Sequence, residues 1–188
     1  MAEMELNTLS LVHAFLRAHV QPGALCIDAT AGRGRDTALL CRLAGPEGRV
    51  IAFDIQQAAL DQTAALLETE GLQAELRLES HVNMADHAAA GSVDCIVFNF
   101  GRLPGGDPTI MTCADSSVVA VETALGLLKP GGVMALAIYY GGLNGYEERD
   151  ALLEYLRDVD NAQYSVLCCD WRNRPNDPPI AVLIWREK

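Results

Sequence analysis

Apolar and polar residues alternate along the chain with the periods of helices and of buried strands. Apolar residues at helical spacing, from Leu9 to Val20, predict an opening helix over residues 7–19, with Asn7 or Thr8 as its cap. Short apolar segments at residues 25–29, 49–54, 74–78, 93–99 and 133–139 predict strands, and helical segments separate them at residues 36–43, 58–69, 116–128 and 147–159. This alternation predicts an α/β fold with a mostly parallel sheet and helices on both faces.

Two further strands are expected at residues 164–170 and 180–185. The loop between them is too short for a crossover helix, so the two strands should form an antiparallel pair. A seven-stranded sheet that ends in such a hairpin resembles the Rossmann-like fold of class I methyltransferases, whereas ordinary dinucleotide-binding domains usually lack the hairpin. The length of 188 residues suits one domain over residues 1–188.

Composition bounds the setting in which the protein works. No apolar run approaches the ~20 residues needed to cross a bilayer. The first ten residues are acidic and polar, unlike a secretory signal or a transit peptide, so we expect a soluble cytoplasmic protein that does not bind membranes. The six cysteines form neither a CxxC pair nor a zinc-like cluster with histidine, and no carboxylate cluster suits magnesium. We therefore expect no metal.

The net charge of −11 disfavours contact with nucleic acid over most of the surface. The expected loops nevertheless carry clustered arginines, namely Arg33, Arg35, Arg102, Arg172 and Arg174. These residues either form a local basic rim on an acidic protein or are ordinary solvated side chains.

A glycine-containing turn follows the first predicted strand. The segment 28–37 reads DATAGRGRDT, in which Gly32 and Gly34 let the backbone approach a ligand closely. Thr37 stands where the third glycine of a GxGxxG motif would be. Asp28 ends the first strand, and Asp54 ends the second strand 20 residues after Gly34, the usual place for a carboxylate that binds ribose hydroxyls.

These features favour S-adenosylmethionine over a pyridine dinucleotide. S-adenosylmethionine carries an ammonium and a sulfonium group and no phosphate, so it suits a site with acidic residues rather than a strict phosphate-binding loop. The turn 129–132, KPGG, precedes the fifth strand as it does widely in methyltransferases. We expect the cofactor-binding residues to be Asp28, Thr30, Gly32, Gly34, Asp36, Thr37, Asp54, Ile55, Gln56, Ser80, His81 and Asn99.

The histidines give a weaker signal. His81 follows the third strand, where this fold commonly contacts adenine, but it is equally compatible with a surface loop. For His13, His19 and His87 the sequence indicates no partner, and they are interpreted as ordinary structural or surface residues.

The loop after the fourth strand is the candidate acceptor site. It begins with Asn99 and resembles the Asn-Pro-Pro-aromatic loop of amino-group methyltransferases, in which the asparagine oxygen accepts a hydrogen bond from the target amine. A free alkylamine has a pKa near ~10 and must lose its proton before it can attack a methyl group. Asp107 and Tyr139 are candidates to receive or relay that proton.

Five segments together resemble one family, the putative rRNA methylases. They are 28–37, 53–56 (FDIQ), 80–81, 98–107 (FNFGRLPGGD) and 173–179 (NRPNDPP), and the likeness runs from about Leu11 to Trp185. Three departures lie near the acceptor: the family usually has Leu-Gly-Tyr at 100–102, Gly-Asn-Gly-His at 32–35, and often a histidine at Gly142.

The bacterial members of this family include enzymes that methylate the 5-aminomethyl-2-thiouridine of tRNA, so the resemblance implies N-methylation of that wobble nucleoside. It places Asn99, Asp107 and Tyr139 in catalysis, and Gly101, Arg102, Leu103, Pro104, Asn173 and Asn176 in substrate binding. Methylation of rRNA or of a small molecule is the alternative, and the net charge mildly favours a small-molecule acceptor. A protein without catalytic activity is disfavoured by Asn99, Pro104 and Asp107. The sequence leaves open whether the protein is a monomer or a homodimer.

Overall fold

The computed structural model describes residues 6–103, 105, 110–141 and 145–188 of the chain. Its elements are α1 (Thr8–His19), β1 (Leu25–Asp28), α2 (Arg35–Ala44), β2 (Arg49–Asp54), α3 (Gln57–Glu70), β3 (Glu75–Leu78), the 3₁₀ helix η1 (His81–Asp86), β4 (Val93–Phe100), α4 (Ala114–Leu127), β5 (Leu128–Ile138), α5 (Gly145–Arg157), β6 (Tyr164–Cys169) and β7 (Ile180–Arg186). The predicted order of helices and strands is confirmed.

The strands form one seven-stranded sheet in the order β3-β2-β1-β4-β5-β7-β6. The pairs among β1 to β5 are parallel, whereas β7 is antiparallel to both of its neighbours, β5 and β6. The predicted antiparallel pair at the end of the chain is thus confirmed, and the mostly parallel sheet with it.

The strand order reverses between β1 and β4. The chain extends the sheet from β1 towards β3 on one side and from β4 towards β6 on the other. Open α/β sheets bind ligands in the crevice at such a switch point, outside the carboxyl ends of the strands. Asp28 at the end of β1 pairs with Val97, two residues before Asn99 on β4, so both residues lie at the carboxyl edge of the sheet beside this switch point.

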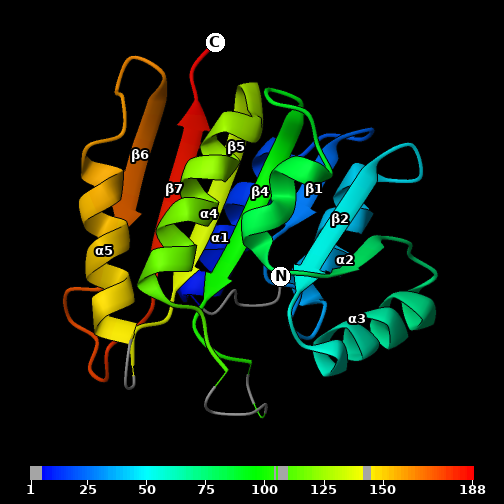
Figure 1. Ribbon diagram of the computed structural model, residues 1–188, viewed down its shortest axis with the longest axis horizontal. Coiled ribbons are helices and arrows are strands. Elements are labelled where there is room, and N and C mark those ends of the chain that lie inside the picture. Colours follow the sequence, from blue (N-terminus) through cyan, green and yellow to red (C-terminus); the bar gives the residue numbers. More distant parts are fainter. Residues whose placement is uncertain (1–5, 104, 106–109, 142–144) are drawn as a thin grey trace.

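Helices cover both faces of the sheet. In Figure 1, α4 and α5 lie in front of the sheet, and α1 and α2 lie behind it. The rear layer packs closely because small residues of the sheet, among them Ala135, Ala137 and Ala181, lie in one buried cluster with Val12 and Leu16 of α1. None of the helices in the described ranges is both long and apolar enough to cross a bilayer.

Two details differ from the prediction. Residues 81–86 form η1, which packs beside α4, whereas the sequence suggested a loop there. β5 begins at Leu128 rather than Val133, because Val93 of β4 pairs with Leu128 and the register then shifts so that Cys95 pairs with Val133. The expected turn at residues 129–132 is therefore an irregular first part of β5.

Candidate active site

The loop after β1 is shaped by its two glycines. Gly32 and Gly34 have φ values of 56° and 76°, which only glycine adopts readily. A Cβ on Gly34 would lie 2.8 Å from Cα of Thr63, so this part of the loop packs directly against α3. The Thr63 hydroxyl also donates to the Gly32 carbonyl at 3.3 Å. The requirement for Gly34 thus comes from contact between the loop and α3.

Asp28 is fully buried beneath this loop. One carboxylate oxygen accepts a hydrogen bond from the Thr30 amide at 3.1 Å, and the other accepts one from the Thr37 hydroxyl at 2.6 Å. Burial, reinforced by the nearby charge of Asp36, raises the pKa of Asp28 from 3.8 to about 7. Asp28 therefore ties the loop to the start of α2, and it reaches the crevice through Thr30 and Thr37.

We expect the ligand-free protein to lose stability from Asp28 as the pH rises. Since its pKa is raised from 3.8 to about 7, the folded state holds this proton more tightly than the unfolded state does. The stabilisation from Asp28 is fully present below about pH 4 and is lost as the pH rises through about 7. This loss lowers the free energy of unfolding by an amount on the order of 1 to 4 kcal/mol.

Urea unfolding of the wild type and of Asp28→Asn across this pH range measures the effect. The free energy of unfolding of the wild type, relative to that of the variant, should fall as the pH rises. A difference that stays constant with pH would contradict the assignment.

Asp54, at the end of β2, lies beside the loop after β1. Its Oδ2 accepts from the Gly32 amide and its Oδ1 from the Gln56 amide, both at 2.9 Å. The side chain is half-buried, and each carboxylate oxygen has a second lone pair, so Asp54 can accept two more hydrogen bonds from a ligand. Ile55, 58% exposed, lies beside it as an apolar surface at the mouth of the crevice.

His81, at the start of η1, is buried rather than on the surface. Its Nε2 is buried and has no hydrogen-bond partner among the described residues, while its ring packs edge-on against Phe98 and Phe100. Burial lowers the pKa of His81, which favours the neutral imidazole. Ser80 caps η1 by accepting from the Val82 amide at 3.4 Å. An unpaired neutral nitrogen near the end of β2 suits an uncharged heterocycle such as adenine.

Asn99 is held at both its backbone and its side chain. Its amide N–H donates to the Thr30 hydroxyl at 2.7 Å, and its Nδ2 donates to Oδ2 of Asp36 at 2.6 Å. His13 Nε2 lies 2.6 Å from the other oxygen of Asp36. The sequence indicated no partner for His13, but α1 packs across the sheet and brings this side chain to the start of α2.

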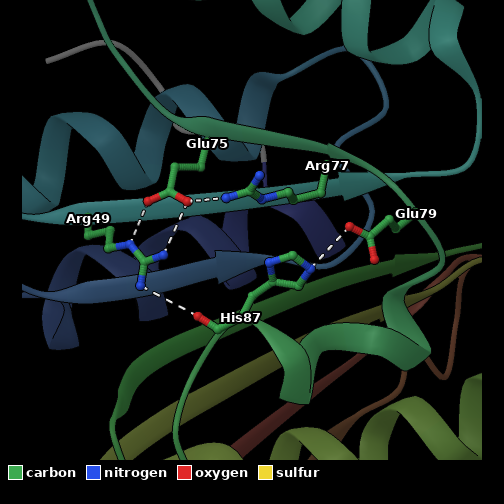
Figure 2. A network of polar contacts seen from close by, with 5 residues as sticks. All are labelled: Arg49, Glu75, Arg77, Glu79 and His87. Carbon is green, nitrogen blue, oxygen red and sulfur yellow. Dashed lines mark hydrogen bonds and ion pairs between the residues drawn. The ribbon is translucent and has the colours of Figure 1, made fainter.

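His19 and His87 also have partners, far from Asn99. His19 Nδ1 donates to the Phe15 carbonyl at 2.8 Å, and its Nε2 accepts from the Trp185 indole at 3.1 Å. His87 Nε2 lies 3.1 Å from Oε1 of Glu79. Figure 2 shows this pair beside the network that Glu75 forms with arginines from β2 and β3. Both contacts join neighbouring elements of the fold, so these two histidines are structural.

The described ends of the loop after β4 are joined to each other. The Gly101 amide donates to the Thr112 hydroxyl at 2.7 Å, and the Thr112 amide donates to the Gly101 carbonyl at 2.9 Å. Arg102 pairs with Met111 next to them. A Cβ on Gly32 would lie 3.6 Å from Leu103, which places this loop against the loop after β1. Pro104, Asp107 and Gly142 lie outside the described residues.

Tyr139 follows β5 beside the same loop. Its backbone N–H donates to the Phe100 carbonyl, and its Cβ lies 3.1 Å from the place of a Cβ on Gly101. The side chain is 42% exposed. Partial burial and the charge of Asp36 raise the pKa of the Tyr139 hydroxyl above its ordinary value. Tyr139 therefore keeps its proton at neutral pH. It can pass this proton on only if it takes up another proton at the same time.

The loop between β6 and β7 is fastened at two places. The Trp171 indole donates to the Thr8 hydroxyl at 2.9 Å, and Arg174 lies over the Trp171 ring at 3.8 Å while donating to the Leu6 carbonyl. On the other side, the Tyr146 hydroxyl donates to Asp177 at 2.5 Å. Asn173 and Asn176 are exposed on this loop, and no hydrogen bond among those of the described residues joins either of them to Asn99.

The five loop arginines are all exposed, but they differ in their surroundings. Arg172 has a side chain that is 90% exposed, with Asp170 at 3.6 Å. Arg174 is engaged with Trp171, so it also has a structural role. Arg33 extends towards the loop after β4, since its guanidinium lies 3.2 Å from the place of a Cβ on Gly105.

Comparison with known proteins places this site in a family. The family model described as Putative rRNA methylase matches residues 50–185. A curated chloroplastic tRNA (mnm(5)s(2)U34)-methyltransferase of Arabidopsis thaliana is 30% identical over 191 residues, which cover 94% of this chain and 69% of that protein.

Solved structures agree with this result. A putative rRNA methylase from Clostridium thermocellum is 37% identical with a TM-score of 0.94, covering 97% of this chain and 99% of that one. A putative methyltransferase from Streptococcus mutans, solved in complex with SAH, is 31% identical with a TM-score of 0.88 over the same shares of the two chains. The chain therefore belongs to the Putative rRNA methylase family and is an S-adenosylmethionine-dependent methyltransferase.

Proposed function

We propose that this methyltransferase acts on a primary amine, that of a 5-aminomethyluridine at the wobble position of tRNA. The observation that carries the proposal is the orientation of Asn99. Its Nδ2 is engaged by Asp36, so its Oδ1 is left to accept a hydrogen bond from an N–H of the acceptor. The tRNA methyltransferase of Arabidopsis, at 30% identity, supports the choice of this amine.

The residues at the crevice fit the cofactor in its three parts. Asp54 has lone pairs for the ribose hydroxyls, and His81 offers an unpaired nitrogen near an apolar surface for adenine. We assign the ribose to Asp54 and the ring to Ile55, Gln56, Ser80 and His81. The methionine end would lie against the loop of Thr30, Gly32 and Gly34, with Asp28, Asp36 and Thr37 supporting that loop. The bound cofactor supplies a methyl group on a positively charged sulfur.

In this proposal Asn99 aligns the amine for transfer. The lone pair of the nitrogen forms the new bond to carbon as the carbon–sulfur bond breaks and its electrons stay on sulfur. Holding the reacting atoms at about 3–3.5 Å from each other lowers the activation free energy of methyl transfer by several kcal/mol. The amine must first be neutral, and Tyr139 keeps its own proton, so we assign Tyr139 to relaying and Asp107 to receiving a proton. We assign Gly101, Arg102, Leu103, Pro104, Asn173 and Asn176 to the acceptor surface.

A tRNA acceptor requires local positive charge on a protein of net charge −11. We expect Arg172→Glu to weaken tRNA binding several-fold and to lower the slope of log affinity against log salt by about one. Arg172 is chosen because its side chain is 90% exposed and its removal disturbs little packing. S-adenosylmethionine affinity should not change.

Arg17→Glu is the matched control, with the same change of charge. Arg17 is exposed in the last turn of α1, at the edge of the sheet opposite the site. Filter binding at several salt concentrations distinguishes the two variants. Equal effects of both would show that only net charge matters, and would count against a site-specific RNA surface.

The acceptor class is tested by methyl transfer from labelled cofactor. We expect label in tRNA taken from cells that lack the enzyme, and none in rRNA or in small alkylamines. The net charge of −11 mildly favours the alternative of a small-molecule acceptor. Label in small amines alone, or in rRNA, would overturn the tRNA proposal while leaving the methyltransferase activity in place.

A further inference from the structure

Three side chains from separate elements form one hydrogen-bonded row beside the acceptor loop. His13 of α1 contacts Asp36 of α2, and Asp36 contacts Asn99 of β4, with both polar distances at 2.6 Å. The side chains of His13 and Asp36 are 18% and 6% exposed, so water competes little for these contacts. The row ends at the residue that orients the acceptor in the proposed function.

The chemistry of the middle residue fixes the direction of both hydrogen bonds. A carboxylate only accepts hydrogen bonds, so Asn99 must present Nδ2 to it, and His13 must carry a proton on Nε2. The Asn99 amide therefore cannot turn over without losing its bond to Asp36. Its Oδ1 consequently remains the atom available to an acceptor N–H.

His13 also restrains Asp36 itself. Asp36 lies close enough to the buried carboxyl of Asp28 for its charge to raise the pKa of that group, so the two carboxylates repel each other when both are ionised. The His13 donor at Oδ1 of Asp36, together with Asn99 at Oδ2, holds this carboxylate in place against the repulsion. With that donor removed, Asp36 can rotate and the Asn99 amide loses its fixed orientation.

We propose that His13 is a positioning residue for methyl transfer, acting on the acceptor through Asp36 and Asn99. This inference rests on the proposed function, because it assumes an acceptor that donates to Asn99 Oδ1. It assigns to α1 a part in specificity for N–H acceptors, in addition to its packing against the sheet.

The test compares His13→Ala, His13→Gln and the control His19→Ala in single-turnover transfer to tRNA. His19 is on the same helix and has its own hydrogen bonds away from Asn99. We expect His13→Ala to slow transfer about 10- to 100-fold, the scale of a small misplacement of reacting groups. His13→Gln, which keeps a donor for Asp36, should restore most of the rate, and His19→Ala should transfer at nearly the wild-type rate.

Two further readouts separate positioning from a general structural role. Calorimetry with S-adenosylhomocysteine should show at most a few-fold loss of affinity for His13→Ala, because Asp28 still holds Thr30 and Thr37. The NMR signals of the Asn99 side-chain amide should shift. Wild-type rates in His13→Ala, or an unshifted Asn99 amide, would overturn the inference. The inference would also be overturned if the transfer rate, the cofactor affinity and the melting temperature fell together in both His13→Ala and His19→Ala. A wild-type protein inactive on tRNA would instead refute the proposed function, and the amide signals would still test the row.

Discussion

Replacement of Asp54 by alanine is expected to weaken S-adenosylmethionine binding by at least about 100-fold. The proposal gives Asp54 two hydrogen bonds to the ribose, and bonds to a charged group contribute about 1.5–3 kcal/mol each. The variant also loses the acceptor that holds the Gly32 and Gln56 amides, so both loops beside the cofactor lose a restraint. Calorimetric titration with S-adenosylmethionine measures the change directly.

Asp61→Ala provides the control for Asp54. Asp61 lies on the exposed surface of α3 and accepts a hydrogen bond only from Gln57 among the described contacts. Like Asp54→Ala, the variant Asp61→Ala removes one negative charge, but it does not touch the crevice. Its binding of S-adenosylmethionine should therefore stay near that of the wild type. Near-wild-type binding by Asp54→Ala would remove Asp54 from the cofactor site.

Asn99→Ala is expected to reduce turnover about 100- to 1000-fold while changing cofactor affinity only slightly. The proposed bond from the acceptor to Asn99 Oδ1 aligns the amine in the transition state, and losses of that kind appear mainly in the chemical step. The backbone of residue 99 would keep its bond to Thr30, so the loop after β1 should remain in place. Single-turnover transfer to tRNA and calorimetry with S-adenosylhomocysteine measure the two quantities.

The control is Asn83→Ala on η1, where the amide lies at the surface beside Glu79. It should leave both turnover and cofactor affinity unchanged. If cofactor binding collapses in Asn99→Ala, then Asn99 supports the cofactor pocket and our placement of the acceptor is wrong.

The sheet was predictable because its strands are read from short, nearly continuous apolar segments, as expected for strands buried on both faces. The antiparallel pairing of the last two strands was predictable because the ten residues between them cannot hold a crossover helix. The start of β5 was not, since residues 129–132 are polar or turn-forming and belong to the strand only through a shifted register with β4. Helix η1 was missed because six residues are too few to show a period.

The residues at strand ends were predictable as a group. Asp28, Asp54 and Asn99 each close an apolar segment, and the parallel sheet brings those ends to one edge. Burial of Asp28 and of His81 could not be inferred, because it depends on how the loops and η1 pack. His13 gave no signal, since its contact with Asp36 spans 23 residues and exists only once α1 lies on the sheet.

Nucleoside mass spectrometry tests directly whether the site methylates the aminomethyl group of a wobble uridine. Purified protein and S-adenosylmethionine are incubated with tRNA from cells that lack the enzyme, and a reaction without S-adenosylmethionine is the control. We expect the 5-aminomethyluridine nucleoside to be converted to one that is heavier by one methyl group on its amine. Unchanged aminomethyluridine, with the new methyl group on another nucleoside or on none, would contradict this expectation.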